Sequence, residues 1–208
     1  MLHVALYQPI IPQNVGNIAR TCVGMDAHLH IIGPTIIDLS DKAVKRAGLD
    51  YWDDLTLTEH ANPEAFFAWA EQQKGNPTTS RDREGADPGV EENESVGPLP
   101  DGRGSLMARP TAPGAMYAVT KFATRRFDTP PYRDGDILLF GSEREGLPPD
   151  IHARFDDEHR IAIPIPGAVR SYNLGNSVAI VLAAAMSKAG LWPGEWAPKE
   201  GHIGENTF

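Results

Sequence analysis

Residues that can hold and orient a ligand gather in three short segments of this chain. The residues that can do chemistry in these segments are Asn14, Arg20, Gly141, Glu143, Ser171 and Asn173. Amide and hydroxyl groups orient a bound molecule through hydrogen bonds, and a guanidinium stabilises negative charge. These residue types predict a site that positions a polar ligand without a metal ion.

The third segment carries the strongest local signal. Its first part, Ile163-Pro-Ile-Pro-Gly167, cannot continue a strand, because each proline removes a hydrogen-bond donor and fixes φ. We therefore expect a stiff loop that leads through Ser171 and Asn173 into a helix, whose free N–H groups begin near Leu174. From the residues alone, Ser171 and Asn173 are explained equally well as the cap of that helix.

The other two segments are less specific by themselves. Gly141 follows an apolar strand, where a glycine lets a ligand approach the backbone, but many strand-to-loop turns look like this. Asn14 is expected to be the N-cap of a helix over residues 15–26. Arg20 lies within that helix and, taken alone, reads as a surface arginine.

Strands and helices are expected to alternate along the chain. The predicted strands are 3–8, 29–32, 55–58, 116–120, 137–140 and 160–163, and the predicted helices are 15–26, 42–47, 62–73 and 176–188. This alternation predicts an α/β fold with a mostly parallel sheet flanked by helices. Ligands of such sheets bind beyond the carboxyl ends of the strands, where the three segments lie.

We expect one domain over residues 1–190, followed by a tail at 191–208. Residues 75–113 interrupt the domain. They are rich in Gly, Pro, Ser and acidic residues and have almost no bulky apolar side chains. Such a segment cannot offset the entropy of ordering, so it is predicted to be an insertion on the surface.

Charge and cysteine content limit the possible functions. The single cysteine, Cys22, excludes an intrachain disulfide and gives no zinc cluster, and it is expected to pack in the core. With no charged leader or long apolar run, the sequence predicts a cytoplasmic protein away from membranes. The net charge of -9 is unusual for a protein that binds RNA. Any RNA-binding face must be local, and Lys42, Lys45 and Arg46 with Arg20 are candidates. From charge alone, a solvated helix face is the favoured explanation of the first three.

In this order, the segments Asn14–Arg20, Leu139–Pro148 and Ile163–Ser177 closely resemble the signature motifs of the SPOUT RNA methyltransferases. The opening segment Leu6–Asn17 and the short chain further resemble the tRNA wobble-nucleotide 2'-O-methyltransferases. The resemblance implies a SPOUT fold with a C-terminal trefoil knot, and a homodimer with its active site at the interface. It also implies S-adenosylmethionine as methyl donor, no metal, and the tRNA anticodon stem-loop as substrate.

The resemblance also assigns roles to residues. It implies the catalytic residues Arg20, Asn14, Ser171 and Asn173, and the cofactor-binding residues Val119, Gly141, Glu143, Ile163, Ser171 and Leu174. A guanidinium does not normally lose its proton, so we expect Arg20 to clamp a phosphate and the developing oxyanion rather than to act as a base.

The helix over Val178–Met186 is apolar on all sides, which favours burial against a partner chain as well as its own core. We expect Ile180 or Leu182 to face outward at a two-fold interface. A central helix in a monomer is the alternative.

Other functions remain open at this point. They are a 2'-O-methyltransferase for another tRNA or rRNA site and a non-catalytic RNA-binding module of the same fold. A Rossmann dehydrogenase is disfavoured, because residues 8–16 lack its glycine-rich fingerprint. The sequence does not distinguish cytidine from uridine at the wobble position.

Overall fold

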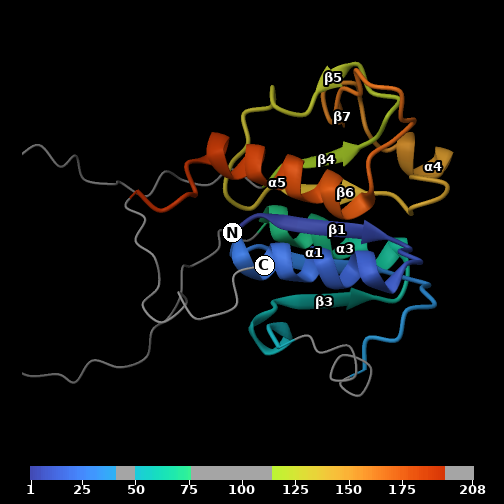
Figure 1. Ribbon diagram of the computed structural model, residues 1–208, viewed down its shortest axis with the longest axis vertical. Helices are drawn as coiled ribbons and strands as arrows, with labels where there is room; N and C mark the ends of the chain where they lie inside the picture. Colours follow the sequence, from blue (N-terminus) through green and yellow to red (C-terminus); the bar gives the residue numbers. More distant parts are fainter. Residues whose placement is uncertain (41–49, 76–113, 195–208) are drawn as a thin grey trace, which may run out of the picture.

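The computed structural model describes residues 1–40, 50–75 and 114–194 (Figure 1). The helix predicted at 42–47, with its basic residues Lys42, Lys45 and Arg46, lies outside the described residues. So do all but the first residue of the predicted insertion at 75–113 and most of the predicted tail.

A parallel sheet forms the centre of the molecule. Its seven strands lie in the order β3-β2-β1-β6-β4-β7-β5. The strands are β1 (His3–Tyr7), β2 (His28–Ile32), β3 (Leu57–His60), β4 (Met116–Val119), β5 (Arg125–Arg126), β6 (Ile137–Phe140) and β7 (Arg160–Ala162). Every ladder between neighbouring strands is parallel. The predicted α/β class with a mostly parallel sheet is confirmed.

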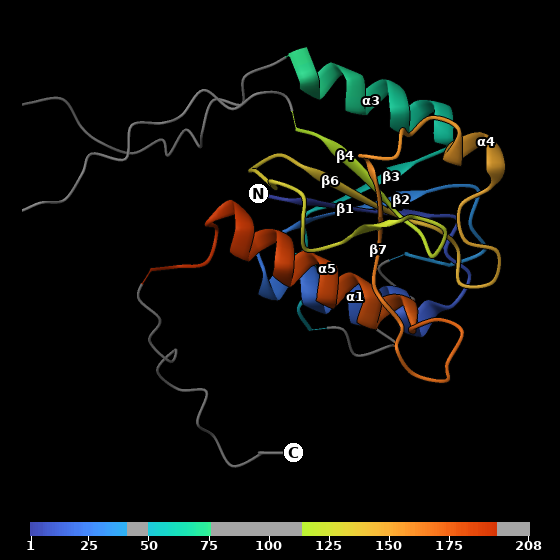
Figure 2. The ribbon, with the colours of Figure 1, turned by 90° about the horizontal axis from the view of Figure 1, so that it is seen from above.

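Helices cover both faces of this sheet. Figure 2 shows α3 (Pro63–Gly75) on one face and α1 (Pro12–Gly24) with α5 (Leu174–Ala189) side by side on the other. A short helix α4 (Pro149–His152) follows β6, and a 3-10 turn η1 (Trp52–Asp54) precedes β3. This three-layer arrangement is what parallel strands require, because both of their faces must be covered.

Alternate residues of each strand supply two separate apolar layers. Val4 and Leu6 of β1 pack in the layer beneath α1 and α5, whereas Ala5 packs in the layer beneath α3. Cys22 is buried in the first layer, as predicted, and burial raises the pKa of its thiol to about 12. At neutral pH this thiol is protonated and serves as a packing group.

The start of helix α1 differs from the prediction. Helix α1 begins at Pro12, and its N-cap is Ile11, which makes no side-chain cap hydrogen bond. The prediction that Asn14 is the N-cap was therefore wrong. A proline fits the first helical position because that position needs no N–H donor, and the helix starts there instead. Asn14 lies in the first turn and is buried.

Helix α5 has one face in the core of its own chain and one partly open face. Leu182 is fully buried within its own chain, so the prediction that it faces outward was wrong. Ile180 is half-buried. Among the described helices, none is both long enough and apolar enough to cross a membrane.

Candidate cofactor and active site

A cavity of about 520 Å³ lies at the carboxyl ends of β4, β6 and β7. Val119 and Phe140 are the last residues of β4 and β6, and Ile163 directly follows β7. All three predicted segments contribute to the lining. This is the edge of the sheet at which ligands of parallel α/β proteins bind.

Hydrogen bonds between Asn14, Glu143 and Asn173 connect the three segments. Asn14 Nδ2 donates to Glu143 Oε1 at 3.1 Å, and Asn173 Nδ2 donates to Asn14 Oδ1 at 2.9 Å. The same carboxylate accepts from the backbone N–H groups of Ile10 at 2.9 Å and Ile11 at 3.1 Å. Three of these four bonds are partly buried, and only the bond from Ile11 is exposed, so the three loops are held in a fixed relative position. We call these three side chains the amide–carboxylate bridge.

Asn173 has a second task in this arrangement. Its Oδ1 accepts from the backbone N–H groups of Gly175 at 2.8 Å and Asn176 at 3.4 Å, which makes it the N-cap of α5. Its Nδ2 group is thereby turned toward Asn14. The two explanations left open by the sequence, helix cap and site residue, therefore both hold for Asn173.

Gly141 is required by the packing of the loop that follows β6. A Cβ atom there would lie 2.1 Å from the carbonyl carbon of Gly146 and 2.3 Å from the nitrogen of Leu147. Ser142 and Gly146 pair as an isolated bridge, with N–O distances of 3.1 and 3.0 Å, and Gly146 has a φ of 74°. Gly141 thus allows one backbone segment to fold directly against another, and the folded loop forms part of the cavity wall.

The structure brings together every residue that was predicted to bind a cofactor. The lining includes Val119, Gly141, Glu143, Ile163, Ser171 and Leu174. It also includes the predicted catalytic residues Asn14, Ser171 and Asn173. The lining combines apolar side chains at the strand ends with hydroxyl and amide groups, so the cavity suits a ligand with both apolar and polar parts.

Arg20 lies elsewhere. Among the residues that the structure describes, Arg20 is not one of those that line the cavity, and its side chain is exposed. The guanidinium carbon lies 4.8 Å from the centroid of the Tyr51 ring, and the Tyr51 hydroxyl donates to the Gly16 carbonyl at 2.8 Å. The cation–π contact orients Arg20 on the outer surface of α1. Within one chain, the structure does not join Arg20 to the other predicted catalytic residues.

Three cationic side chains at the cavity were missed by the sequence analysis. Lys121, Arg144 and Arg170 are exposed and line the cavity, together with the acidic Glu145. Arg144 and Arg170 lie within two of the segments that form the site, and Lys121 lies two residues after Val119, which was the available signal. They place local positive charge at this edge of an acidic protein.

His152 of α4 also lines the cavity. Burial, followed by the positive charge of Arg160, lowers the pKa of its imidazole. It is therefore neutral at physiological pH and faces the exposed ring of Phe122, with 6.0 Å between the ring centroids. A neutral imidazole can accept a proton, so the cavity holds one group able to act as a weak base.

Known proteins share both the sequence pattern and the fold. A tRNA (cytidine(34)-2'-O)-methyltransferase from Methylovorus glucosotrophus is 33% identical over 89% of this chain and 94% of its own length. A solved structure described as giving insights into the 2-OH methylation of C/U34 on tRNA is 32% identical, covers 90% of both chains, and has a TM-score of 0.63. An AdoMet-bound rRNA methyltransferase from Sinorhizobium meliloti shares the fold at 23% identity, with a TM-score of 0.61 over 89% of this chain and 56% of that chain.

The family match covers the site as well as the sheet. The SpoU rRNA Methylase family matches residues 1–95 and 106–183, which include all three segments and the amide–carboxylate bridge. The chain therefore belongs to the SpoU rRNA Methylase family.

Proposed function

We propose that this protein transfers a methyl group from S-adenosylmethionine to the ribose 2'-hydroxyl of the wobble nucleotide of tRNA. The observation that carries the proposal is the amide–carboxylate bridge, which joins the three segments around a single cavity at the carboxyl edge of the sheet. Relatives that match nearly the whole chain are named for this reaction.

The cavity suits the proposed cofactor. Its volume of about 520 Å³ lies within the range of sites for ligands of this size. Val119, Ile163 and Leu174 offer apolar surface for a purine ring, and the loop that Gly141 permits presents backbone groups to polar atoms. When bound, S-adenosylmethionine would supply an electrophilic methyl group, and a metal ion is not needed for this chemistry.

The residues of the chain then have positioning roles. Ser171 lines the cavity, and its hydroxyl is assigned to orient the ribose or the cofactor. Asn173 and Asn14 fix the start of α5 against the start of α1, which holds the loop from Ile163 to Leu174 in one conformation. Such preorganisation lowers the entropic part of the barrier.

We assign Arg20 to the cavity of a second copy of the chain. On its own chain Arg20 is exposed on α1, away from the cavity, while α1 and α5 together present a partly open face that includes Ile180. A homodimer formed through this face would complete each site with an arginine from the partner. There Arg20 would clamp a substrate phosphate and the developing oxyanion.

Pairs of differently tagged chains test this assignment. A hybrid dimer of Arg20→Ala with Asn173→Ala has one complete site if Arg20 acts across the interface, and should retain roughly half the wild-type rate. A hybrid of the wild type with the Arg20→Ala/Asn173→Ala double variant should then be inactive. If Arg20 acts within its own chain, the two results are reversed.

The local charge supports an RNA substrate. Lys121, Arg144 and Arg170 are exposed residues of the cavity lining and can contact phosphates of the anticodon stem-loop, in spite of the net charge of -9. We further propose one domain over residues 1–190, a cytoplasmic location, and a trefoil knot formed by the segment from β7 through α5. The knot rests on the family resemblance.

Calorimetric titration with S-adenosylmethionine tests the proposal against its alternatives. The enzyme should bind S-adenosylmethionine with one site per chain and should not bind a nicotinamide dinucleotide. A folded protein that fails to bind S-adenosylmethionine would instead support a non-catalytic RNA-binding module. If the protein binds S-adenosylmethionine but methylates another RNA, the proposed reaction would stand and the proposed tRNA substrate would be wrong.

A further inference from the structure

Three histidines come together near the amino ends of β1 and β2, whereas the cavity lies at the carboxyl ends of strands. His3 and His28 are the first residues of β1 and β2, and they are register partners in the parallel ladder. His30 lies two residues after His28, so its side chain is on the same sheet face. One nitrogen of each of the three rings lies within 4.8 Å of the others. We call these residues the histidine triad.

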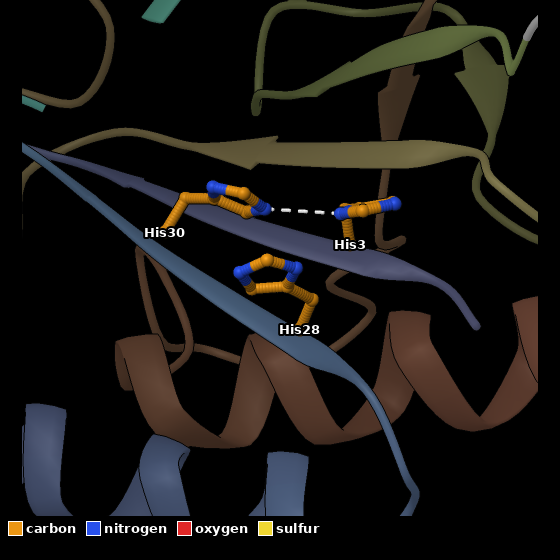
Figure 3. Close-up of side chains that lie close together, drawn as sticks. All are labelled: His3, His28 and His30. Atoms are coloured by element: carbon orange, nitrogen blue, oxygen red, sulfur yellow. Dashed lines mark hydrogen bonds between the residues drawn. The ribbon is translucent and has the colours of Figure 1, made fainter. Parts of the chain in front are cut away.

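Figure 3 shows that the three rings face a common gap. His3 Nδ1 and His30 Nε2 are 3.0 Å apart across it. His28 uses Nε2 for a 2.9 Å hydrogen bond with Thr58 Oγ1, and its other nitrogen, Nδ1, points toward the same gap. Three imidazole nitrogens from two strands therefore lie within 4.8 Å of one another. The His28 and His30 rings are stacked with centroids 4.1 Å apart, so His28 must rotate for its lone pair to point at an ion shared with His30.

The outer nitrogens of His30 and His28 are already held by partners. His30 Nδ1 lies 3.1 Å from His60 Nε2, and His28 Nε2 is bonded to Thr58. If His30 and His28 each donate an N–H to these partners, their inward nitrogens keep a free lone pair. Metal-binding histidines are usually oriented in this way by a second hydrogen bond.

From this geometry we propose that His3, His28 and His30 bind one divalent transition-metal cation of the zinc type. Imidazole is a preferred ligand of zinc, nickel and cobalt, and Zn–N bonds of about 2.0–2.1 Å place tetrahedral ligands about 3.3–3.4 Å apart. The 3.0 Å separation of His3 and His30 is close to this value. A water molecule would complete the coordination.

Binding requires little rearrangement of protons. Without metal, the hydrogen bond between His3 Nδ1 and His30 Nε2 contains one proton. Movement of that proton to His3 Nε2 frees both inward nitrogens, so no net proton release is needed. Burial and mutual repulsion lower the pKa values of His3 to about 4 and of His30 to about 2, so protons do not compete with the metal at neutral pH.

The position allows entry of an ion but excludes a direct part in methyl transfer. His3 and His28 are only partly buried, whereas His30 is fully buried. Trp69 of α3 covers the triad, with ring centroids 4.2 Å from His30 and 5.4 Å from His3. The cavity lies at the carboxyl ends of β4, β6 and β7, whereas the triad lies near the amino ends of β1 and β2. The ion would therefore tie β1 to β2 and stabilise the fold.

Tag-free, full-length protein stripped with a chelator tests the proposal. Cobalt(II) should bind with one equivalent per chain and a Kd of about 10 µM or tighter, give visible d–d absorption, and quench the fluorescence of Trp69. Zinc at a free concentration of 100 times Kd should raise the Tm by roughly 5–10 °C. The Trp69→Phe variant should keep the d–d absorption and lose the cobalt-dependent quenching.

Matched variants separate the triad from other histidines. His3→Asn and His28→Asn lie at partly exposed strand starts and should fold, bind cobalt at least tenfold more weakly, and lose the zinc-dependent rise in Tm. His159→Asn, at an exposed histidine paired with Asp156, should behave as the wild type. Weaker or absent binding in the wild type, or binding unchanged in both triad variants, would overturn the proposal and leave a hydrogen-bonded histidine chain.

Discussion

The two ends of the strands, which we call the carboxyl edge and the amino edge of the sheet, hold polar residues in different ways. At the carboxyl edge, polar groups stand on loops and helix starts around an open cavity, and long-range hydrogen bonds such as Asn14–Glu143 and Asn173–Asn14 keep them in place. At the amino edge, the histidine triad stands on the strands themselves and is packed beneath Trp69. Strand β1 connects the two edges: His3 begins it, and the loop that bonds to Glu143 follows its end.

This difference predicts which substitutions affect catalysis and which affect the free energy of unfolding. Loop groups around a cavity can meet a ligand, but they need a bridge to fix their positions. Strand groups under a helix are fixed by the fold, so a change among them affects the free energy of unfolding first. Substitutions at the carboxyl edge should therefore alter turnover or cofactor binding, with a loss of stability where they disturb the bridge or the loop packing. Substitutions at the amino edge should alter stability alone.

The largest effect is expected from Arg20→Ala. Loss of a major electrostatic group in the transition state should lower kcat about 100- to 1000-fold, while S-adenosylmethionine binding and the Tm stay near wild type. Arg20→Lys should restore little, because a point charge does not reproduce the guanidinium fork. Single-turnover methylation of an anticodon stem-loop measures this. Near-normal turnover by Arg20→Ala would contradict a catalytic role and would leave Arg20 as an exposed surface arginine.

Gly141→Ala should damage both the fold and the cavity. The added Cβ would meet backbone atoms of Gly146 and Leu147, which cannot move as a flexible side chain would. We expect a loss of about 1–3 kcal/mol in the free energy of unfolding, with weaker cofactor binding. Urea denaturation and calorimetry measure the two effects. Gly167→Ala is the matched control, since a Cβ there meets nothing within 4 Å.

Glu143→Gln tests the amide–carboxylate bridge with little change of shape. The carboxylate accepts from two backbone N–H groups and from Asn14, and a neutral amide offers only one acceptor oxygen. The free energy of unfolding should fall by about 1–2 kcal/mol, and S-adenosylmethionine affinity should fall several-fold. Glu145→Gln, in the same loop, should change the free energy of unfolding little. Equal losses in both variants would refute the bridge as the cause.

The smallest effect is expected at the amino edge, as a function of pH. Burial, His28 and the N-terminal ammonium lower the pKa of His3 to about 4, while Asp134 opposes them. Between pH 6.5 and pH 4, His3 is protonated in the unfolded chain but stays neutral in the folded chain. The free energy of unfolding therefore falls as the pH decreases from 6.5 toward 4. Between pH 7.5 and pH 5, metal-free His3→Asn should lose on the order of 1 kcal/mol less stability than the wild type. An identical loss in both proteins would remove His3 from the acid response.

The sequence predicted much of the carboxyl edge because its signals are local. Prolines after Ile163, glycine after Phe140 and an asparagine before an apolar helix each mark the end or start of an element. Their convergence followed from the rule that parallel strands end at one edge. The start of α1 was missed because Pro12 opens the helix without a side-chain cap, so Asn14 was free for the bridge.

The amino edge was not predictable in the same way. His28 and His30 alternate on one strand, but their approach to His3 depends on the register of β1 against β2, which no local pattern specifies. The position of Arg20 depends likewise on what covers α1. Spacing along one helix does not reveal whether Arg20 faces the cavity of its own chain or the outer surface.

The position of the transferred methyl group tests the central claim most directly. Purified protein, S-adenosylmethionine and unmodified tRNA should yield one 2'-O-methyl group on the wobble nucleotide, mapped by mass spectrometry of nuclease fragments. A stem-loop with 2'-deoxyribose at that nucleotide should accept no methyl group. Methylation of a base, methylation at another nucleotide, or transfer to the deoxy substrate would contradict the proposed function.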